Sequence, residues 1–189
     1  GNLATASPLI KDELGLSNVQ IGVLLSAFFW SYAPMQPIAG WLAQRFDVRH
    51  VLAGGLALWA VATVLTGFAT GFAMLLTLRV LLGIGESVQY PCNSQLLAQR
   101  APEHARGRAN GIIGAGQSLG PTVGTLVGGL LMATLGWRAA FIAFGVLSLL
   151  WLWPWRAATR DGAATAEPVG AASAIPYRAI IRECALWGT

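Results

Sequence analysis

The chain has 189 residues, of which 55% are hydrophobic and only 11% are charged, whereas an ordinary soluble domain carries about 25% charged residues. This composition excludes a soluble globular fold. The formal net charge of +4 would by itself suggest nucleic acid or a membrane surface as a partner. The positions of the charges, given below, instead indicate a membrane topology and no nucleic-acid partner.

Long stretches without a charged residue account for this composition. Residues 19–43, 51–78, 109–137 and 139–155 contain no Asp, Glu, Lys or Arg, and residues 72–98 contain only two such residues. Because about 20 apolar residues in a helix cross the hydrocarbon core of a bilayer, each stretch is long enough to span it. The sequence therefore predicts an all-α membrane protein.

The predicted spans begin with a partial one. GNLATASP at the start of the chain is interpreted as the end of an apolar helix that finishes near Pro8, and IKDELGLSN follows as an outside loop. Ser17 or Asn18 offers an N-cap for the second span, which runs to about Ala43. Four further spans are predicted at roughly 50–69, 72–98, 108–134 and 138–156.

Arginines are concentrated in alternate connections between these spans. They follow the second, fourth and sixth spans, at Arg45, Arg49, Arg100, Arg106, Arg108, Arg156 and Arg160. The other connections carry little net charge. Because cytoplasmic loops of membrane proteins are enriched in Lys and Arg, we expect loops 44–50, 99–108 and 157–180 to be cytoplasmic. The protein would then be a multi-pass protein of the inner (plasma) membrane, with the lipid bilayer as a partner.

The sequence after the sixth span changes character. TRDGAATAEPVGAASAIP is rich in Ala, Gly and Pro and has no apolar period, which is typical of a linker. We predict a transmembrane bundle at 1–156, a cytoplasmic linker at 157–180 and the start of a further, truncated half at 181–189. Six spans followed by a linker is the layout of one half of a transporter built from two halves. The chain is therefore interpreted as a fragment truncated at both ends.

The fourth span carries the two charges that need an explanation. Arg79, Gly83, Glu86, Tyr90 and Asn93 recur at steps of three and four residues, which places them on one helical face. A charge near the middle of a bilayer costs on the order of 3 kcal/mol, so these side chains should face the interior of the bundle. Either Arg79 captures an anionic substrate and Glu86 carries a proton, or Arg79 forms a structural ion pair with a carboxylate of another helix.

The fifth span contains a stripe of glycines four residues apart, at Gly116, Gly120, Gly124 and Gly128. Such a face lets neighbouring helices approach closely, so we expect a helix-packing role, with Pro121 providing a place to bend. Gln117 lies beside this stripe and either contacts the substrate or bonds a neighbouring helix.

The second span contains two polar side chains one turn apart. Tyr32 and Gln36 share a face of the helix, and Pro34 and Pro37 disturb the helix around them. Tyrosines are common at membrane surfaces, but Tyr32 lies in the middle of its span. A hydrogen-bonding role toward the lumen and an ordinary packing role both remain open.

A membrane enzyme or receptor is a different class of interpretation. An enzyme needs a nucleophile, a metal cluster or a paired acid and base, and the sequence shows no such constellation. His50 and His104 lie in predicted cytoplasmic loops without a second ligand at metal-binding spacing, and Cys92 and Cys184 indicate neither a disulfide nor a metal site. We therefore expect no enzyme, no metal and no cofactor.

The loop after the second span resembles a signature of the major facilitator superfamily. In GWLAQRFDVRH at 40–50, Gly40, Leu42 and Arg45 fit that signature, whereas Gln44 replaces the usual acid and Asp47 a common glycine. The resemblance implies a cytoplasmic gating loop that contains Gly40, Arg45, Asp47 and Arg49.

Within this superfamily, the chain resembles the anion:cation symporter family. RVLLGIGESVQYP at 79–91 is similar to the fourth-span motif of that family, an Arg followed by Gly-Glu and then Pro. EHARGRANGI, GWRAAF and NLATASP resemble the start of span five, the turn into span six and the end of span one. The resemblance implies the six-helix N-terminal half of a twelve-helix fold. An acidic–basic pair normally precedes Asn2 in this family, so the first helix would be truncated.

The resemblance also implies a function. That function is proton- or cation-coupled uptake of an organic anion, such as a sugar acid or an aromatic carboxylate, held at midplane between two halves during alternating access. By position, Arg79 would bind the carboxylate and Glu86 would be the coupling protonation site. Hydrogen bonds to the substrate would come from Tyr32 and Gln117, with Gln36 and Asn93 as further candidates. The partners would be the anion, the coupling proton or another cation, and the missing C-terminal half.

An exporter is the alternative within the same superfamily. LGPTVGTLVGG at 119–129 also resembles the glycine–proline signature of drug:proton antiporters. Such a protein would pump lipophilic compounds outward through the same bundle. The pair Arg79 and Glu86 favours the anion importer.

Overall fold

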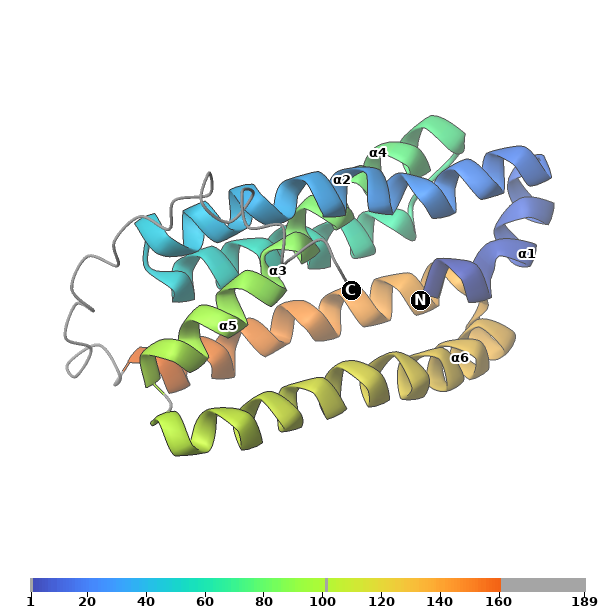
Figure 1. Ribbon diagram of the computed structural model, residues 1–189. Coiled ribbons are helices and arrows are strands. Elements are labelled where there is room, and N and C mark those ends of the chain that lie inside the picture. The colour runs from blue at the N-terminus through green and yellow to red at the C-terminus, as the bar shows by residue number, and fades with distance from the viewer. Residues whose placement is uncertain (1, 101, 161–189) are drawn as a thin grey trace, which may run out of the picture.

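The computed structural model describes residues 2–100 and 102–160, and within them every regular element is a helix. The helices are α1 (Asn2–Leu14), α2 (Asn18–Arg45), α3 (Val48–Thr66), α4 (Phe72–Ser87), α5 (Gln89–Arg100) and α6 (Glu103–Arg160). They run roughly along a common direction and form one elongated bundle (Figure 1). The predicted all-α class is confirmed. Residues 157–160 continue α6, and the rest of the predicted linker lies outside the described residues, as does the start of the further half.

α6 contains two helices that fold back on each other. Gly136 has φ 78° and ψ 163°, a left-handed backbone that a residue with a Cβ adopts only at a cost. The arm at 103–135 and the arm at 137–160 are named here the first and second arms of α6. Figure 1 shows the sharp reversal between them. These arms are the predicted fifth and sixth spans.

The predicted fourth span at 72–98 corresponds to one segment, Phe72–Gln99, that is long and apolar enough to cross a membrane, and a one-residue turn at Val88 divides it into two helices. α4 ends at Ser87, Val88 forms a turn, and α5 begins at Gln89. Pro91 explains the break because it has no N–H to donate to the carbonyl of Ser87, and its ring crowds that carbonyl.

α1 corrects the prediction that the first span finishes near Pro8. The helix continues through Pro8 to Leu14, and Gly15 with φ 63° ends it. Pro8 leaves the carbonyl of Ala4 without its usual helical partner, but the Ser7 hydroxyl donates to that carbonyl at 2.8 Å. The helix therefore tolerates the proline. α2 then begins as predicted, because Ser17 and Gln20 form a reciprocal capping box.

Three described segments are long and apolar enough to cross a membrane, namely Val48–Thr66, Phe72–Gln99 and Glu103–Ala157. The last contains both arms of α6, so these segments account for four of the predicted spans. α2 has 28 residues but is not among them, and α1 has only 13.

α4 lies against both α2 and α3 because two of its glycines admit close backbone contact. A Cβ at Gly83 would lie 2.6 Å from the carbonyl oxygen of Phe28, and one at Gly85 would lie 2.7 Å from the backbone nitrogen of Trp59. The second arm of α6 packs on α3 in the same way, through Gly145. These contacts bury the middle of α4, which carries Arg79.

Three glycines of the stripe in the predicted fifth span make no close helix contact with the described residues. A Cβ at Gly116, Gly120 or Gly124 would meet no atom within 4 Å, although Gly128 is buried. The close approaches occur instead at the glycines named above. A helix-packing role for the stripe stays a prediction.

Candidate functional site

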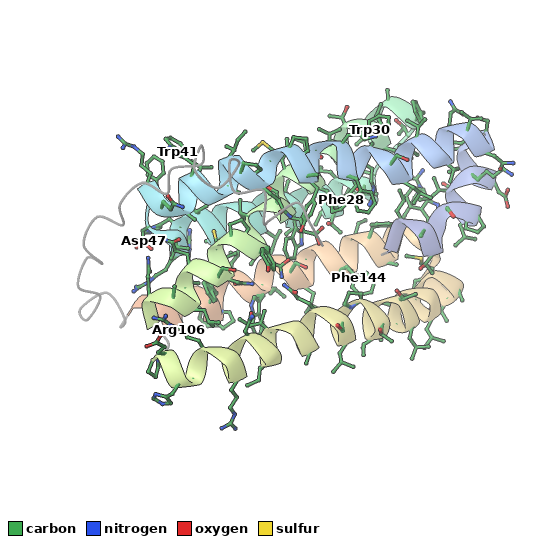
Figure 2. All side chains as sticks on the ribbon, in the orientation of Figure 1. Phe28, Trp30, Trp41, Asp47, Arg106 and Phe144 are labelled. Carbon is green, nitrogen blue, oxygen red and sulfur yellow. The ribbon has the colours of Figure 1, made fainter. Side chains whose placement is uncertain are left out.

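A cavity of about 560 Å³ lies inside the bundle. α1, α2, α3, α4 and both arms of α6 all contribute to its walls, and most of its lining is apolar or aromatic. Its polar side chains are Thr63, Arg79, Glu86 and Ser148. Figure 2 shows Phe28 projecting from α2 toward the second arm of α6, which carries Phe144; both residues line the cavity. The cavity therefore combines an apolar wall with two ionisable groups.

Arg79 is the buried cation of this cavity. The residue is only 8% exposed, and its Nε and Nη2 atoms have no hydrogen-bond partner among the described residues. These two nitrogens form one edge of the planar guanidinium, which matches the two oxygens of a carboxylate. A buried donor without a partner costs about 1–3 kcal/mol. The edge therefore has the two-point donor geometry that suits an anion.

Glu86 lies two turns after Arg79 on α4 and lines the same cavity. It is half-buried. No carboxylate lies within ion-pair distance of Arg79 in the part of the chain that the structure describes. The structural ion pair considered from the sequence thus has no partner there. The predicted placement of Arg79 and Glu86 on one interior face agrees with their shared cavity.

The other predicted substrate contacts do not line this cavity. Tyr32 stacks on Phe28 with ring centroids 5.2 Å apart, and Gln36 is half-buried one turn further along α2. Gln117 is exposed on the first arm of α6. Asn93 lines a second cavity of about 410 Å³, beyond the turn at Val88.

Several lining residues carried no predicted role. Phe28, Trp59, Phe141 and Phe144 form much of the aromatic wall. Gly120, Pro121 and Gly124 of the first arm of α6, which were predicted to serve helix packing and bending, also line the cavity. The predicted second, third and sixth spans each contain two or more aromatic residues, so the sequence offered no signal for which of them face inward.

The predicted gating loop joins α2 to α3. The Asp47 carboxylate caps α3 by accepting the backbone N–H of Arg49 at 2.9 Å, and it lies 3.6 Å from Nδ1 of His50. Gly40 lies inside α2, and Arg45 is its exposed last residue. Figure 2 shows Asp47 and Arg106 at the same end of the bundle, opposite the connection between α1 and α2. Two of the three loops predicted to be cytoplasmic, 44–50 and 99–108, therefore lie at one end.

A polar network ties the bundle together at the other end. Glu13 at the end of α1 accepts hydrogen bonds from Nε1 of Trp137 at 2.6 Å and from Nε of Arg138 at 2.8 Å. Nη1 of Arg138 donates to the carbonyls of Gly67 and Ala69 at 3.0 and 2.8 Å. The sequence signal for Arg138 was its position as the single charge between two long uncharged stretches. Its partner, 125 residues away, carried no signal.

The contribution of Glu13 to stability should depend on pH. Hydrogen bonds from Arg138 and then Trp137 hold the pKa of the Glu13 carboxyl below its usual 4.5. A lowered pKa in the folded state means that the carboxylate stabilises the fold fully above the ordinary pKa and loses this contribution as the pH falls through the lowered value. We expect wild type to unfold at a higher temperature than Glu13→Gln at neutral pH, and the two midpoints to converge in acid.

Asp12→Asn is the matched control for this comparison, because it removes an exposed carboxylate from the neighbouring position. It should leave the unfolding midpoint close to that of wild type across the same pH range. A gap between wild type and Glu13→Gln that persisted unchanged into strong acid would contradict the assignment.

Comparison with known families places this bundle in a class. A family model of the Major Facilitator Superfamily matches residues 1–189. The chain therefore belongs to the Major Facilitator Superfamily, as its sequence resemblance implied, and it is a multi-pass membrane protein of a transporter family.

Three individual relatives show which kind of transporter the chain is similar to. The chain is 41% identical over 150 residues to the probable sulfoacetate transporter SauU of Cupriavidus necator, covering 79% of this chain and 35% of that protein. It is 34% identical to the D-galactonate transporter of Escherichia coli O6:H1, covering 82% and 36%. It is 31% identical to the probable anion transporter 4, chloroplastic, of Oryza sativa subsp. japonica, covering 98% and 34%. The chain thus spans about a third of the length of these relatives, all of which are named as anion transporters.

Proposed function

We propose that the complete protein is a secondary active transporter that takes up an organic anion, such as a sugar acid or another carboxylate, together with protons. It would do so by alternating access across the inner (plasma) membrane. The observation that carries this proposal is the buried donor edge of Arg79, which lines a cavity inside the bundle and bonds to no described residue. The names of the relatives support an anion as the substrate class.

Each residue has a distinct role in this proposal. Arg79 binds the carboxylate through Nε and Nη2, and Glu86, in the same cavity, exchanges the coupling proton. Tyr32, Gln36, Asn93 and Gln117 are proposed to reach the substrate only when a second half of the protein completes the site. The loop that contains Arg45 and Asp47 closes the cytoplasmic side.

An exporter is the second candidate, because Gly120, Pro121 and Gly124 of the antiporter-like signature line the same cavity. Transport direction separates the two. We expect full-length protein in vesicles with an acidic exterior to accumulate at least one labelled anion among sulfoacetate, D-galactonate and benzoate above its outside concentration. Vesicles without the protein are the control. Outward pumping of a lipophilic cation, with no uptake of any of these anions, would replace the importer by the exporter.

A further inference from the structure

We propose that Glu13 and Arg138 are positioning residues for the anion site. Their ion pair at the end of the bundle holds Trp137 and Phe141 in place, and these rings hold the Arg79 guanidinium in its binding orientation. This inference rests on the proposed function, because it assigns the pair a role toward the anion that Arg79 is proposed to bind.

Arg138 joins three parts of the chain through one side chain. It contacts Glu13 of α1 at 2.8 Å, and it donates to the carbonyls of Gly67 and Ala69 in the turn between α3 and α4. Carbonyls at the C-terminal end of a helix lack helical partners, and a cation is favourable there. The side chain therefore fixes the ends of α1 and α3 against the start of the second arm of α6.

A continuous line of contacts leads from this ion pair to Arg79. Trp137 donates to Glu13 at 2.6 Å, and its ring meets that of Phe141 edge to face with centroids 6.2 Å apart. The guanidinium of Arg79 lies 5.9 Å from the centroid of the Phe141 ring. Trp137 and Phe141 are only 3% and 1% exposed. Because protein interiors are closely packed, a displacement of Trp137 is passed to Phe141 and then to Arg79.

A second contact is made just before α4. The carbonyl of Ala69 that Arg138 holds lies just before Phe72, where α4 begins. Arg79 is two turns into that helix. The Arg138 guanidinium thus positions the Phe141 ring beside Arg79, through Trp137. It also positions the start of α4, the helix that carries Arg79.

These contacts predict a particular kinetic effect. Loss of the Glu13 carboxylate leaves the donors of Arg79 present but less well oriented, so affinity for the anion should fall. The maximal rate should change little, because neither Arg79 nor Glu86 is removed. A purely structural role would instead lower the amount of folded protein without changing the KM of the molecules that remain folded.

The experiment measures initial uptake rates by the full-length protein in proteoliposomes against anion concentration. Sulfoacetate, D-galactonate and benzoate are tested as probes in parallel. We expect Glu13→Ala to raise KM about tenfold, the lower end of the loss seen when groups that orient metal ligands are removed, with the maximal rate per folded molecule nearly unchanged. Glu13→Gln, which keeps one acceptor oxygen, should raise KM less. Asp12→Asn should leave KM unchanged.

Trp137→Phe is a second variant, for use if Glu13→Ala does not fold. It keeps a buried aromatic ring but removes the Nε1 donor. It is expected to raise KM as well. A KM for both variants equal to that of Asp12→Asn would overturn the inference, as would a fall in maximal rate at unchanged KM. If wild type transports none of the probe anions, the proposed function fails and the inference fails with it. If transport depends on Arg79 but not on Glu13, only the inference fails.

Discussion

Replacing Glu86 with Gln in the full-length protein should reduce uptake driven by a pH gradient to the level of empty vesicles. Gln fits the same half-buried position in the cavity, but it can neither take up nor release a proton. Exchange of anion inside the vesicle for labelled anion outside needs no net proton movement, so it should persist. Both rates are measured on the same vesicle preparation, with and without an acidic exterior.

Glu103→Gln is the matched control for this variant. It makes the same chemical change at an exposed position in the first turn of α6, outside the cavity, and should retain gradient-driven uptake. If Glu86→Gln accumulated anion as wild type does, the coupling role of Glu86 would be wrong. If it lost exchange as well, Glu86 would be required for the transport cycle itself rather than for coupling alone.

Replacing Arg79 with Ala should abolish both gradient-driven uptake and exchange. Truncating one partner of a buried, hydrogen-bonded charge pair costs about 2–5 kcal/mol, which corresponds to a loss of about 30-fold to several thousand-fold in affinity. Arg79→Lys should be intermediate, because Lys keeps the charge but lacks the planar two-donor edge. Binding of labelled anion to the purified full-length protein and uptake in vesicles measure the two effects.

Arg108→Ala is the control for Arg79, since it removes an arginine from an exposed position near the start of α6. It should leave anion affinity close to that of wild type. Normal exchange by Arg79→Ala would show that the arginine is structural and that the substrate lies elsewhere.

The bundle and the central pair could be predicted because their signals are local. Long apolar stretches with at most two charges report directly on bilayer thickness, and they gave the positions of α3, α4 and both arms of α6. The seven-residue separation of Arg79 and Glu86 spans two helical turns, so both face the same cavity in the structure. Beyond Ser87 the predicted shared face of Tyr90 and Asn93 with Glu86 was wrong. Tyr90 is 60% exposed, and Asn93 lines the second cavity rather than the one that contains Arg79 and Glu86.

The remaining features depend on contacts between distant parts of the chain. The ion pair of Glu13 with Arg138 joins residues 125 positions apart, and the inward-facing choice of Phe28 or Phe144 depends on how each helix is rotated in the bundle. A single sequence carries neither kind of information. Pro8 is a smaller failure: a proline was expected to end the first span, but α1 continues through it to Leu14.

The central claim is that Arg79 binds the carboxylate of the substrate, and one double-mutant cycle tests it most directly. The affinity of the full-length protein is measured for a transported anion and for its neutral carboxamide, in wild type and in Arg79→Ala. We expect wild type to lose most of its affinity when the carboxylate becomes an amide, and Arg79→Ala to bind both compounds equally weakly, so that the two changes are strongly non-additive. Independent, additive losses from the two changes would contradict direct contact between Arg79 and the carboxylate.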